Sequence, residues 1–552
     1  MSARTRFVIG ILVAVATACG GGEPAGEGPG TAEAPVDGGT AVISTVSDFD
    51  AFNELISTDY DTNQTMSYIL FSNLVQLDED MNYQPYLADS FWMSDDGLTL
   101  TFRIRDGMKW HDGVPVTADD VVWTYEMSVN DEIAYANLSY FQYVTRAVRV
   151  DDRTVRFEFS APHSDALMDF TEWSPMPKHL LQDVPPAEMR NAPFNRHPVG
   201  NGPFRFVSWD ANQQAVFEAN PDFVLGRPHL DRIVVRVIPE QTTELTELLT
   251  GGIDLMRAVP PAEMHRVEES DDVYGIVYQA RSYTFIAWNT RNPLFASSKV
   301  RRALTMGINR QQIVDALLYG YGTIAVSDAM PFQWEFNDRL QPWPYDVDQA
   351  RQMLAEEGWT DHDGDGIIDK DGRPFRFVLG TNQGNDLRED IVVIVQNDLK
   401  QLGIDVQPRL IEWNTLITDL KAKRFEAAVS GWSTDFKFNP TDLFSTEAIE
   451  GKYNYPSYSN PEADSLMTKA LVTLNREDAK PLWIRYSEII HEDQPYTFLY
   501  YLQERLGVSN RLRDVEADAR GHLISAAQWW IPENMQNRGG EQPVAIAVDA
   551  DR

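Results

Sequence analysis

Cys19 is the only cysteine among the 552 residues of this chain. A single cysteine can form no internal disulfide and no zinc cluster of the cysteine type, so the fold must be stabilised by its apolar core. The chain is long enough for more than one such core. Hydrophobic residues make up 43% and charged residues 24% of it, which is typical of a globular protein.

The residues before Cys19 have the pattern of a signal peptide. A short basic region precedes the apolar stretch from Phe7 to Ala18, which is too short to span a bilayer. The sequence Ala16-Thr17-Ala18-Cys19 is similar to the lipobox of bacterial lipoproteins, in which the cysteine becomes the lipidated N-terminus after cleavage. We therefore expect residues 1–19 to be a lipoprotein signal peptide, with Cys19 as the lipidated residue. Because Ala16 replaces the usual leucine, cleavage by the ordinary signal peptidase is the alternative.

Residues 20–40 are expected to form a flexible linker. They are mainly Gly, Glu, Pro and Ala and contain almost no large apolar side chain, so they cannot bury a core. An anchor, a spacer and a globular body are the layout of a protein tethered to a surface. We therefore expect the protein to be exported to the periplasm or cell surface and to contact the membrane through its N-terminal lipid.

The formal net charge of −36 argues against two kinds of partner. Nucleic-acid binding needs basic patches that neutralise phosphate, so no nucleic acid is expected. Electrostatic attachment to anionic lipid is disfavoured for the same reason. We interpret the acidic balance mainly as a source of solubility, with the attraction of cationic ligands as the alternative.

Strands and helices are predicted to be mixed along the body. Residues 99–105 and 154–159 alternate apolar and polar side chains with period two, which predicts half-buried strands. A helix is expected from Ala118 after the N-cap Thr117, and another from Asp346 to Glu357. Such mixing is typical of α/β lobes.

Several segments of the body, in order, resemble one family. The most specific runs from Tyr86 to Val122 and reads YLADSFWMSDDGLTLTFRIRDGMKWHDGVPVTADDVV. Residues 198–204, 285–290 and 431–440 add PVGNGPF, FIAWNT and GWSTDFKFNP. From about Ala41 to about Asp514, the chain resembles the family 5 extracellular solute-binding proteins of ABC transporters, the dipeptide-, oligopeptide- and nickel-binding group.

The resemblance implies an α/β, two-lobed periplasmic-binding-protein type II fold with an extra subdomain in the first lobe and an interlobe ligand cleft. Lobe 1 is expected over residues 41–282, with the subdomain at about 61–197, and lobe 2 over 283–503. Residues 504–552 are expected to return to lobe 1 and form the C-terminal tail. A monomer of this kind captures a peptide or similar small solute by hinge closure and delivers it to an ABC permease, without chemistry on the ligand.

The resemblance also suggests ligand-binding residues. In peptide-binding members, the motif matched by 431–440 supplies an aspartate that pairs with the ligand's α-ammonium; here it is Asp435, with Trp432 as a wall. A buried ammonium needs such a charged partner. The alternative is a loop aspartate that caps its own backbone. The sequence Phe436-Lys437-Phe438 departs from the family's pattern.

Further candidates come from the first extended segment of the body and from two tryptophans. In the family, the ligand main chain pairs with this segment, which implies Ser44, Thr45 and Val46 here. Trp413 and Trp288 are candidates to line the cleft. Core packing is an equal alternative for both.

An acidic loop has part of a calcium-binding pattern. Asp361, Asp363, Asp365 and Asp369 stand at positions 1, 3, 5 and 9 of an EF-hand-like sequence, but position 12 is Gly372 instead of glutamate. A hairpin connection is the other interpretation. We expect no cofactor, with calcium at this loop as the alternative.

The sequence contains no motif of a known catalytic class among nucleophile elbows, Walker loops, Rossmann glycines and His-Glu-x-x-His zinc sites. We therefore expect no enzyme. The alternatives to a transport function are a tethered solute sensor and, less favoured, a secreted hydrolase.

Overall fold

The computed structural model describes residues 34–537. The predictions for Cys19, for the signal peptide and for the greater part of the linker concern residues outside this range. The first strand, β1 (Thr40–Thr45), begins at the last residue of the expected linker. Within the described range, no helix is both long and apolar enough to cross a membrane.

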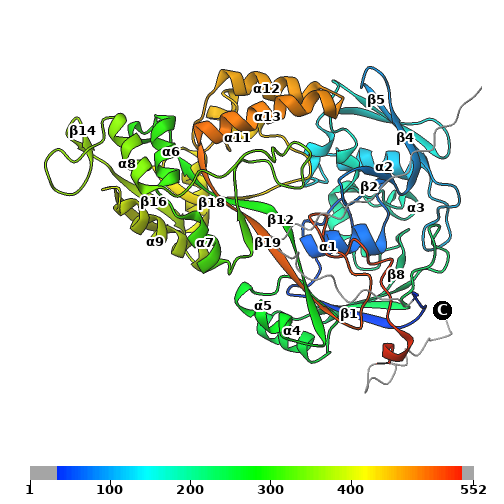
Figure 1. Ribbon diagram of the computed structural model, residues 1–552. Helices are drawn as coiled ribbons and strands as arrows, with labels where there is room; N and C mark the ends of the chain where they lie inside the picture. The colour runs from blue at the N-terminus through cyan, green and yellow to red at the C-terminus, as the bar shows by residue number, and fades with distance from the viewer. Residues whose placement is uncertain (1–33, 538–552) are drawn as a thin grey trace, which may run out of the picture. The chain divides into compact units, whose positions relative to one another are not determined.

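A large mixed sheet forms the centre of the fold (Figure 1). Within residues 34–537 it has 11 strands in the order β17-β16-β18-β12-β19-β11-β1-β10-β9-β8, with β13 paired to β19. The bounds of the strands that follow β1 in this sheet are β8 (Phe204–Asp210), β9 (Gln214–Ala219), β10 (Arg232–Val237), β11 (Leu255–Met256), β12 (Val273–Trp288), β13 (Gly322–Ile324), β16 (Arg376–Asn382), β17 (Asp405–Ile411), β18 (Ala427–Ser433) and β19 (Tyr496–Ser509).

The long antiparallel strands β12 and β19 join two lobes (Figure 1). Lobe 1 is the part around β1 and β8–β11, and lobe 2 is the part around β16–β18. The β12–β19 ladder is interrupted between the pairs Gln279↔Gln503 and Tyr283↔Tyr501. This interruption lies beside the two lobe limits expected at residues 282–283 and 503–504, which stay a prediction.

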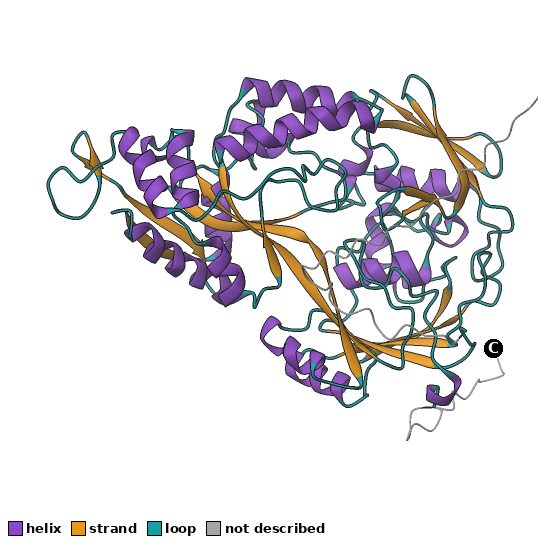
Figure 2. Cartoon of the chain, in the orientation of Figure 1, coloured by secondary structure: helices purple, strands orange, loops and turns teal. Residues whose placement is uncertain are grey.

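Helices cover the strands on both faces (Figure 2). In lobe 2 the faces can be told apart along β12, because successive side chains of a strand point to opposite sides. Ile286 and Trp288 enter one core cluster, and Phe285 and Ala287 enter the other. The helices are α1 (Tyr60–Thr65), α2 (Ala118–Ser128), α3 (Lys178–Leu181), α4 (Gln241–Leu249), α5 (Met264–Glu268), α6 (Ser298–Met306), α7 (Arg310–Leu317), α8 (Val347–Glu356), α9 (Asp386–Lys400), α10 (Trp413–Lys421), α11 (Thr441–Phe444), α12 (Pro461–Val472) and α13 (Arg476–Asp493).

Lobe 1 also carries a separate four-stranded antiparallel sheet in the order β4-β5-β7-β6. Its strands are β4 (Ala88–Met93), β5 (Thr99–Ile104), β6 (Val144–Arg149) and β7 (Thr154–Phe159). The two strands predicted from period-two alternation, β5 and β7, are confirmed. The predicted helix α2 is confirmed as well, and Thr117 and Asp120 form its capping box.

Two short hairpins complete the strands of the described residues. The first pairs β2 (Val75–Leu77) with β3 (Tyr83–Pro85). The second pairs β14 (Asp369–Lys370) with β15 (Arg373–Pro374) and follows the acidic loop. Helix α8 begins after Asp346, whose carboxylate accepts the backbone N–H of Gln349, so the predicted acidic cap is confirmed.

Candidate ligand-binding cleft

A cavity of ≈ 320 Å³ lies where β12 and β19 pass between the lobes. Side chains from both lobes and from the crossing strands surround it, so a solute held there would contact both lobes at once. Its lining comprises Tyr60, Arg257, Tyr278, Gln279, Ala280, Arg281, Ser282, Ser433, Thr434, Asp435, Glu504 and Ala519.

The lobe-1 wall of the cavity is a linked group of charges. The Nε of Arg257 lies 3.1 Å from Oδ1 of Asp61, and its Nη1 lies 3.9 Å from Oε2 of Glu504. The hydroxyl of Tyr278 donates to the same Glu504 oxygen at 2.7 Å. Burial, followed by the Glu504 charge, raises the pKa of Tyr278, so this hydroxyl stays a donor. The positive charge of Arg257 is therefore already balanced within the protein.

The second arginine of the cavity is also paired. Arg281 lies on the crossing part of β12, and its Nη1 donates to Oε1 of Glu172 at 2.8 Å. Its guanidinium carbon lies 4.6 Å from the centre of the Phe436 ring. Both arginines of the cavity thus have carboxylate partners within the protein.

Asp435 differs from these paired charges. It follows β18, and its side chain is exposed at the cavity. Its backbone is held, because Gln333 Nε2 donates to its carbonyl at 2.9 Å and the adjacent Thr434 N–H donates to Arg281 O at 2.8 Å. Within residues 34–537, its carboxylate makes no hydrogen bond or ion pair. In particular, it does not accept a hydrogen bond from the backbone of its own loop. The carboxylate is thus positioned and available to a cation.

Trp432 packs beside the cleft without lining the cavity. It is half-buried and stacks on Tyr455 at 5.2 Å between ring centres and on Phe285 at 6.2 Å. Its Nε1 donates to the Tyr496 hydroxyl at 3.4 Å. Trp432 therefore supports β18, the strand from which Asp435 extends.

The other two candidate tryptophans, Trp288 and Trp413, lie outside the cavity. Trp288 is fully buried in a lobe-2 core cluster, and its Nε1 donates to Thr497 Oγ1 at 3.0 Å. Trp413, the first residue of α10, is 45% exposed and lies below the Arg388 guanidinium at 5.8 Å. The cleft interpretation of Trp288 is therefore corrected to core packing, because its side chain is fully buried among the apolar residues of this cluster.

The end of β1 contacts the cleft indirectly. Ser44 Oγ donates to Glu244 at 2.6 Å and to Leu255 O at 3.1 Å, so this hydroxyl is used within the core. Burial raises the pKa of Glu244 to about 7. Thr45 Oγ1 donates at 3.1 Å to Asp61, the partner of Arg257. Val46 is exposed at the strand end. The main-chain pairing proposed for these three residues stays a prediction.

Sequence reasoning missed most of the lining residues. Tyr60, Arg257 and Glu504 come from three distant parts of the chain, and no local pattern joins them. One signal was present: Arg281 stands inside a long, largely apolar strand, where a charge needs a partner.

The acidic loop lies at one end of lobe 2. Ligand oxygens of Asp361, Asp363 and Asp369 lie within 4.8 Å of one another. Asp361 also accepts the backbone N–H groups of Gly364 and Gly366 at 2.7 and 3.1 Å, and Asp365 accepts that of Ile367 at 2.8 Å. The loop thus uses its carboxylates to form the turns that lead into β14.

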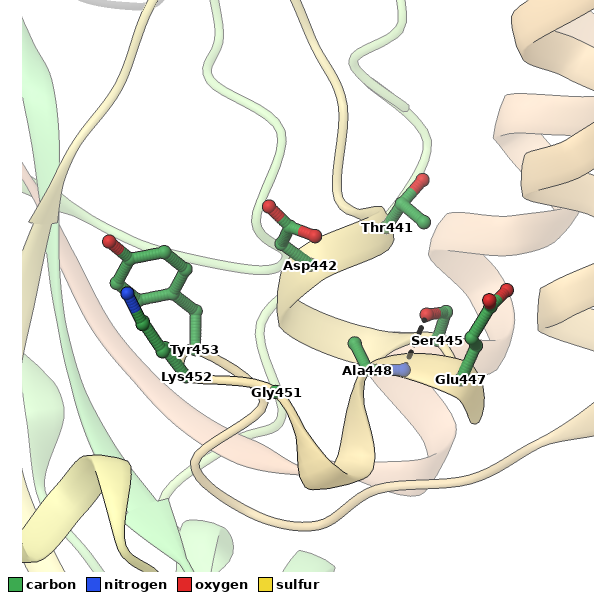
Figure 3. Close-up of a pocket in the computed structure, with 8 residues that line it drawn as sticks. All are labelled: Thr441, Asp442, Ser445, Glu447, Ala448, Gly451, Lys452 and Tyr453. Atoms are coloured by element: carbon green, nitrogen blue, oxygen red, sulfur yellow. Dashed lines mark hydrogen bonds between the residues drawn. The ribbon is translucent and has the colours of Figure 1, made fainter. Parts of the chain in front are cut away.

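A different pocket, of ≈ 390 Å³, opens on the surface of lobe 2 (Figure 3). It surrounds α11 and the following turn, where Ser445 Oγ accepts the backbone N–H of Ala448 at 3.2 Å. It shares no lining residue with the cavity between the lobes. Its exposed Asp442 therefore provides a comparison for Asp435.

Two α/β lobes joined by crossing strands around a cavity have the architecture of a binding protein that closes on its ligand. Residues 82–454 match the family described as bacterial extracellular solute-binding proteins, family 5 Middle. The chain belongs to this family, and family 5 proteins are exported.

Relatives match this chain over most of its length. The oligopeptide-binding protein AppA of Bacillus subtilis is 34% identical over 531 residues, which are 95% of this chain and 97% of AppA. The heme-binding protein A of Haemophilus influenzae is 27% identical, over 77% of this chain and 80% of that protein. The structure of AppA in complex with a nonapeptide is similar with a TM-score of 0.71 at 35% identity, covering 91% of this chain and 100% of that one. The expected fold class and family are confirmed.

Proposed function

We propose that this protein is the solute-binding component of an ABC uptake transporter and that it captures peptides in the cavity between its lobes. The observation that carries this proposal is the available Asp435 carboxylate in a cavity whose arginines are already paired. A peptide's α-ammonium supplies the positive partner that the Asp435 carboxylate lacks, and a charge-assisted hydrogen bond between them offsets the desolvation of the ammonium. The similarity to oligopeptide-binding AppA supports the same ligand class.

Closure of the lobes would hold the solute between them. Ligand binding favours the closed form because only there do both lobes contact the ligand. The ladder interruption between Gln279 and Tyr283 is our candidate for the hinge, since it removes strand pairing where the lobes join. A permease that recognises the closed form then distinguishes loaded from empty protein.

We propose that the protein is no enzyme and acts as a monomer. No histidine stands among the described residues that line the cavity, and Glu504 is already bound to Tyr278 and Arg257. A nucleophile paired with a base, which a hydrolase needs, is therefore not supported by this lining. A tethered sensor would use the same site, and a permease and ATPase encoded beside the gene would favour transport.

A thermal-shift screen tests the ligand class. We expect peptides of two or more residues with a free N-terminus to raise the Tm, because a ligand that binds only the folded state stabilises it. Sugars and free organic acids serve as comparison ligands. A Tm that rises with one of those and with no peptide would contradict the proposal.

Lipid anchoring through Cys19 is the second part of the proposal. In cells that process lipoproteins, we expect the mature protein to enter the detergent phase of a Triton X-114 extraction and the Cys19→Ala variant to stay in the aqueous phase. A diacyl chain buries many CH₂ groups, each of which contributes about 0.8 kcal/mol. Intact mass of the mature protein checks the modification. The same partitioning for both proteins would show that Cys19 carries no lipid.

We propose that the protein needs no resident cofactor. The acidic loop lacks the bidentate glutamate of an EF-hand at Gly372, and its carboxylates already accept their own backbone N–H groups. Calcium or EDTA is therefore expected to leave the Tm unchanged, with magnesium as the control ion. A rise that is specific to calcium and lost in Asp361→Asn would identify a calcium site instead.

A further inference from the structure

One lobe-1 segment presents acidic side chains to lobe 2 and to the crossing strand β12. Asp165, Asp169 and Glu172 stand four and three residues apart, around a short helical turn at 168–170. Asp165 lies 3.4 Å from Nη2 of Arg476 on α13 of lobe 2. Glu172 is the partner of Arg281 on the crossing strand.

The ion pair of Asp169 with Lys437 is the most buried of the three pairs that this segment makes. Lys437 of lobe 2 lies with its Nζ 3.0 and 3.2 Å from the two carboxylate oxygens of Asp169. The Asp169 side chain is 2% exposed and that of Lys437 is 18% exposed. An ionised carboxylate at this depth needs its cation, because removal of one partner from a buried pair leaves an uncompensated charge.

An apolar contact accompanies this pair. Phe436, next to Lys437, is buried in a cluster with Leu77, Met81 and Met168 of lobe 1. Ala519 belongs to the same cluster and also lines the ligand cavity. The Gln333 side chain donates to the carbonyls of both Asp435 and Phe436, at 2.9 and 3.3 Å. Residues 435–437 are thus one rigid element whose first member is the proposed ligand partner.

We propose that Phe436 and Lys437 form a clasp between the lobes, with Met168 and Asp169 as its lobe-1 half, and that this clasp favours the closed form before any solute binds. The clasp rests on the proposed hinge closure, and it assigns a role to the sequence Phe436-Lys437-Phe438 that departs from the family's pattern. Because Lys437 follows Asp435 by two residues, the clasp also positions the Asp435 carboxylate at the cavity.

A pre-closed protein binds its solute more tightly. Apparent affinity scales with the populated fraction of the binding-competent form, so a clasp that raises this fraction removes part of the cost of closure. The clasp does not itself need a ligand, and its effect is measurable in the empty protein.

The protonation of Asp169 makes the closure of the clasp depend on pH, which provides a second test of it. Four groups face its carboxylate: Lys437, His163 with Nε2 at 3.5 Å, and the like charges of Asp165 and Asp435. Burial raises the pKa of Asp169 to about 7, although the Lys437 charge acts in the opposite direction and lowers this pKa. Burial lowers the pKa of His163 to about 3. A carboxyl whose pKa is higher in the closed form favours closure as the pH falls, since the closed form binds the proton more tightly. Loss of Lys437 strengthens this dependence.

Distance measurements on the empty protein test the clasp. In a Cys19→Ala background, spin labels at Glu188→Cys of lobe 1 and Lys400→Cys of lobe 2 report the lobe separation by pulsed dipolar spectroscopy, because both sites are exposed and no other cysteine remains. At pH 8, Lys437→Met is expected to reduce the closed population about tenfold or more. The double variant Lys437→Met/Asp169→Asn restores it, because both charges are gone. Lys452→Met, which removes an exposed lysine of the same lobe, leaves it unchanged.

Two further readouts separate the clasp from a general loss of structure. The closed population of Lys437→Met should rise again between pH 8 and pH 5, whereas that of the double variant should not. Amide hydrogen exchange of residues 433–438 should accelerate in Lys437→Met and return to the parent rate in the double variant. An unchanged distance distribution in Lys437→Met would overturn the proposal, as would a double variant that stays as open as the single one. Neither result depends on the identity of the solute, so failure of the clasp and failure of peptide binding are distinguishable.

Discussion

Asp435→Asn is expected to weaken the binding of a peptide with a free N-terminus by about 10- to 100-fold, since a hydrogen bond to a charged group contributes about 1.5–3 kcal/mol. The substitution keeps the size of the side chain and removes the charge that the α-ammonium needs. The carboxylate makes no bond within residues 34–537, so the Tm of the empty protein should not change. Isothermal titration calorimetry measures the affinity.

Two comparisons make this result specific. Asp442→Asn removes another exposed carboxylate seven residues away, outside the cavity, and should keep the parent affinity. An N-acetylated form of the same peptide should bind the parent weakly and lose little further affinity in Asp435→Asn. An unchanged affinity in Asp435→Asn would eliminate the ammonium role of this residue.

Trp288→Ala is expected to cost about 3–5 kcal/mol of folding stability, the usual range for truncation of a fully buried aromatic side chain. The substitution opens a cavity among Phe295, Phe377 and the other members of the lobe-2 core and leaves Thr497 without its indole donor. Differential scanning calorimetry should show a lower Tm for the transition that includes lobe 2. The lobes need not unfold together, so each transition is fitted separately.

Trp413→Ala is the matched control, because its ring is 45% exposed and lies at the start of a surface helix. Its Tm should stay close to that of the parent, since exposed substitutions usually change stability by about 0.5 kcal/mol or less. A Trp288→Ala variant that keeps the parent's Tm but no longer binds peptide would contradict core packing and support a ligand-binding role for Trp288.

Local pattern was sufficient to predict several elements of the fold. Period-two alternation predicted β5 and β7, and cap residues predicted α2 and α8, because both signals arise from neighbours in the chain. Asp435 was found for a different reason: the motif that contains it resembles a known one. Its availability became visible only with the ion pairs of the cavity in place.

The rest of the site depends on contacts between distant residues. Arg281 and Glu172 are separated by 109 positions, and Lys437 and Asp169 by 268. A sequence shows each charge but not which opposite charge it meets. The tryptophans show the same limit: the alternation of β12 could place Trp288 toward a core or a cleft, and only the helices packed on that face decide.

Native mass spectrometry of the protein purified under gentle conditions tests the central claim most directly. We expect a fraction of the molecules to carry bound mass that gas-phase activation releases as short peptides with free N-termini. The same preparation of Asp435→Asn should carry less of it. Release of a sugar or a metal chelate in place of peptides, from the parent protein and from Asp435→Asn alike, would contradict the account.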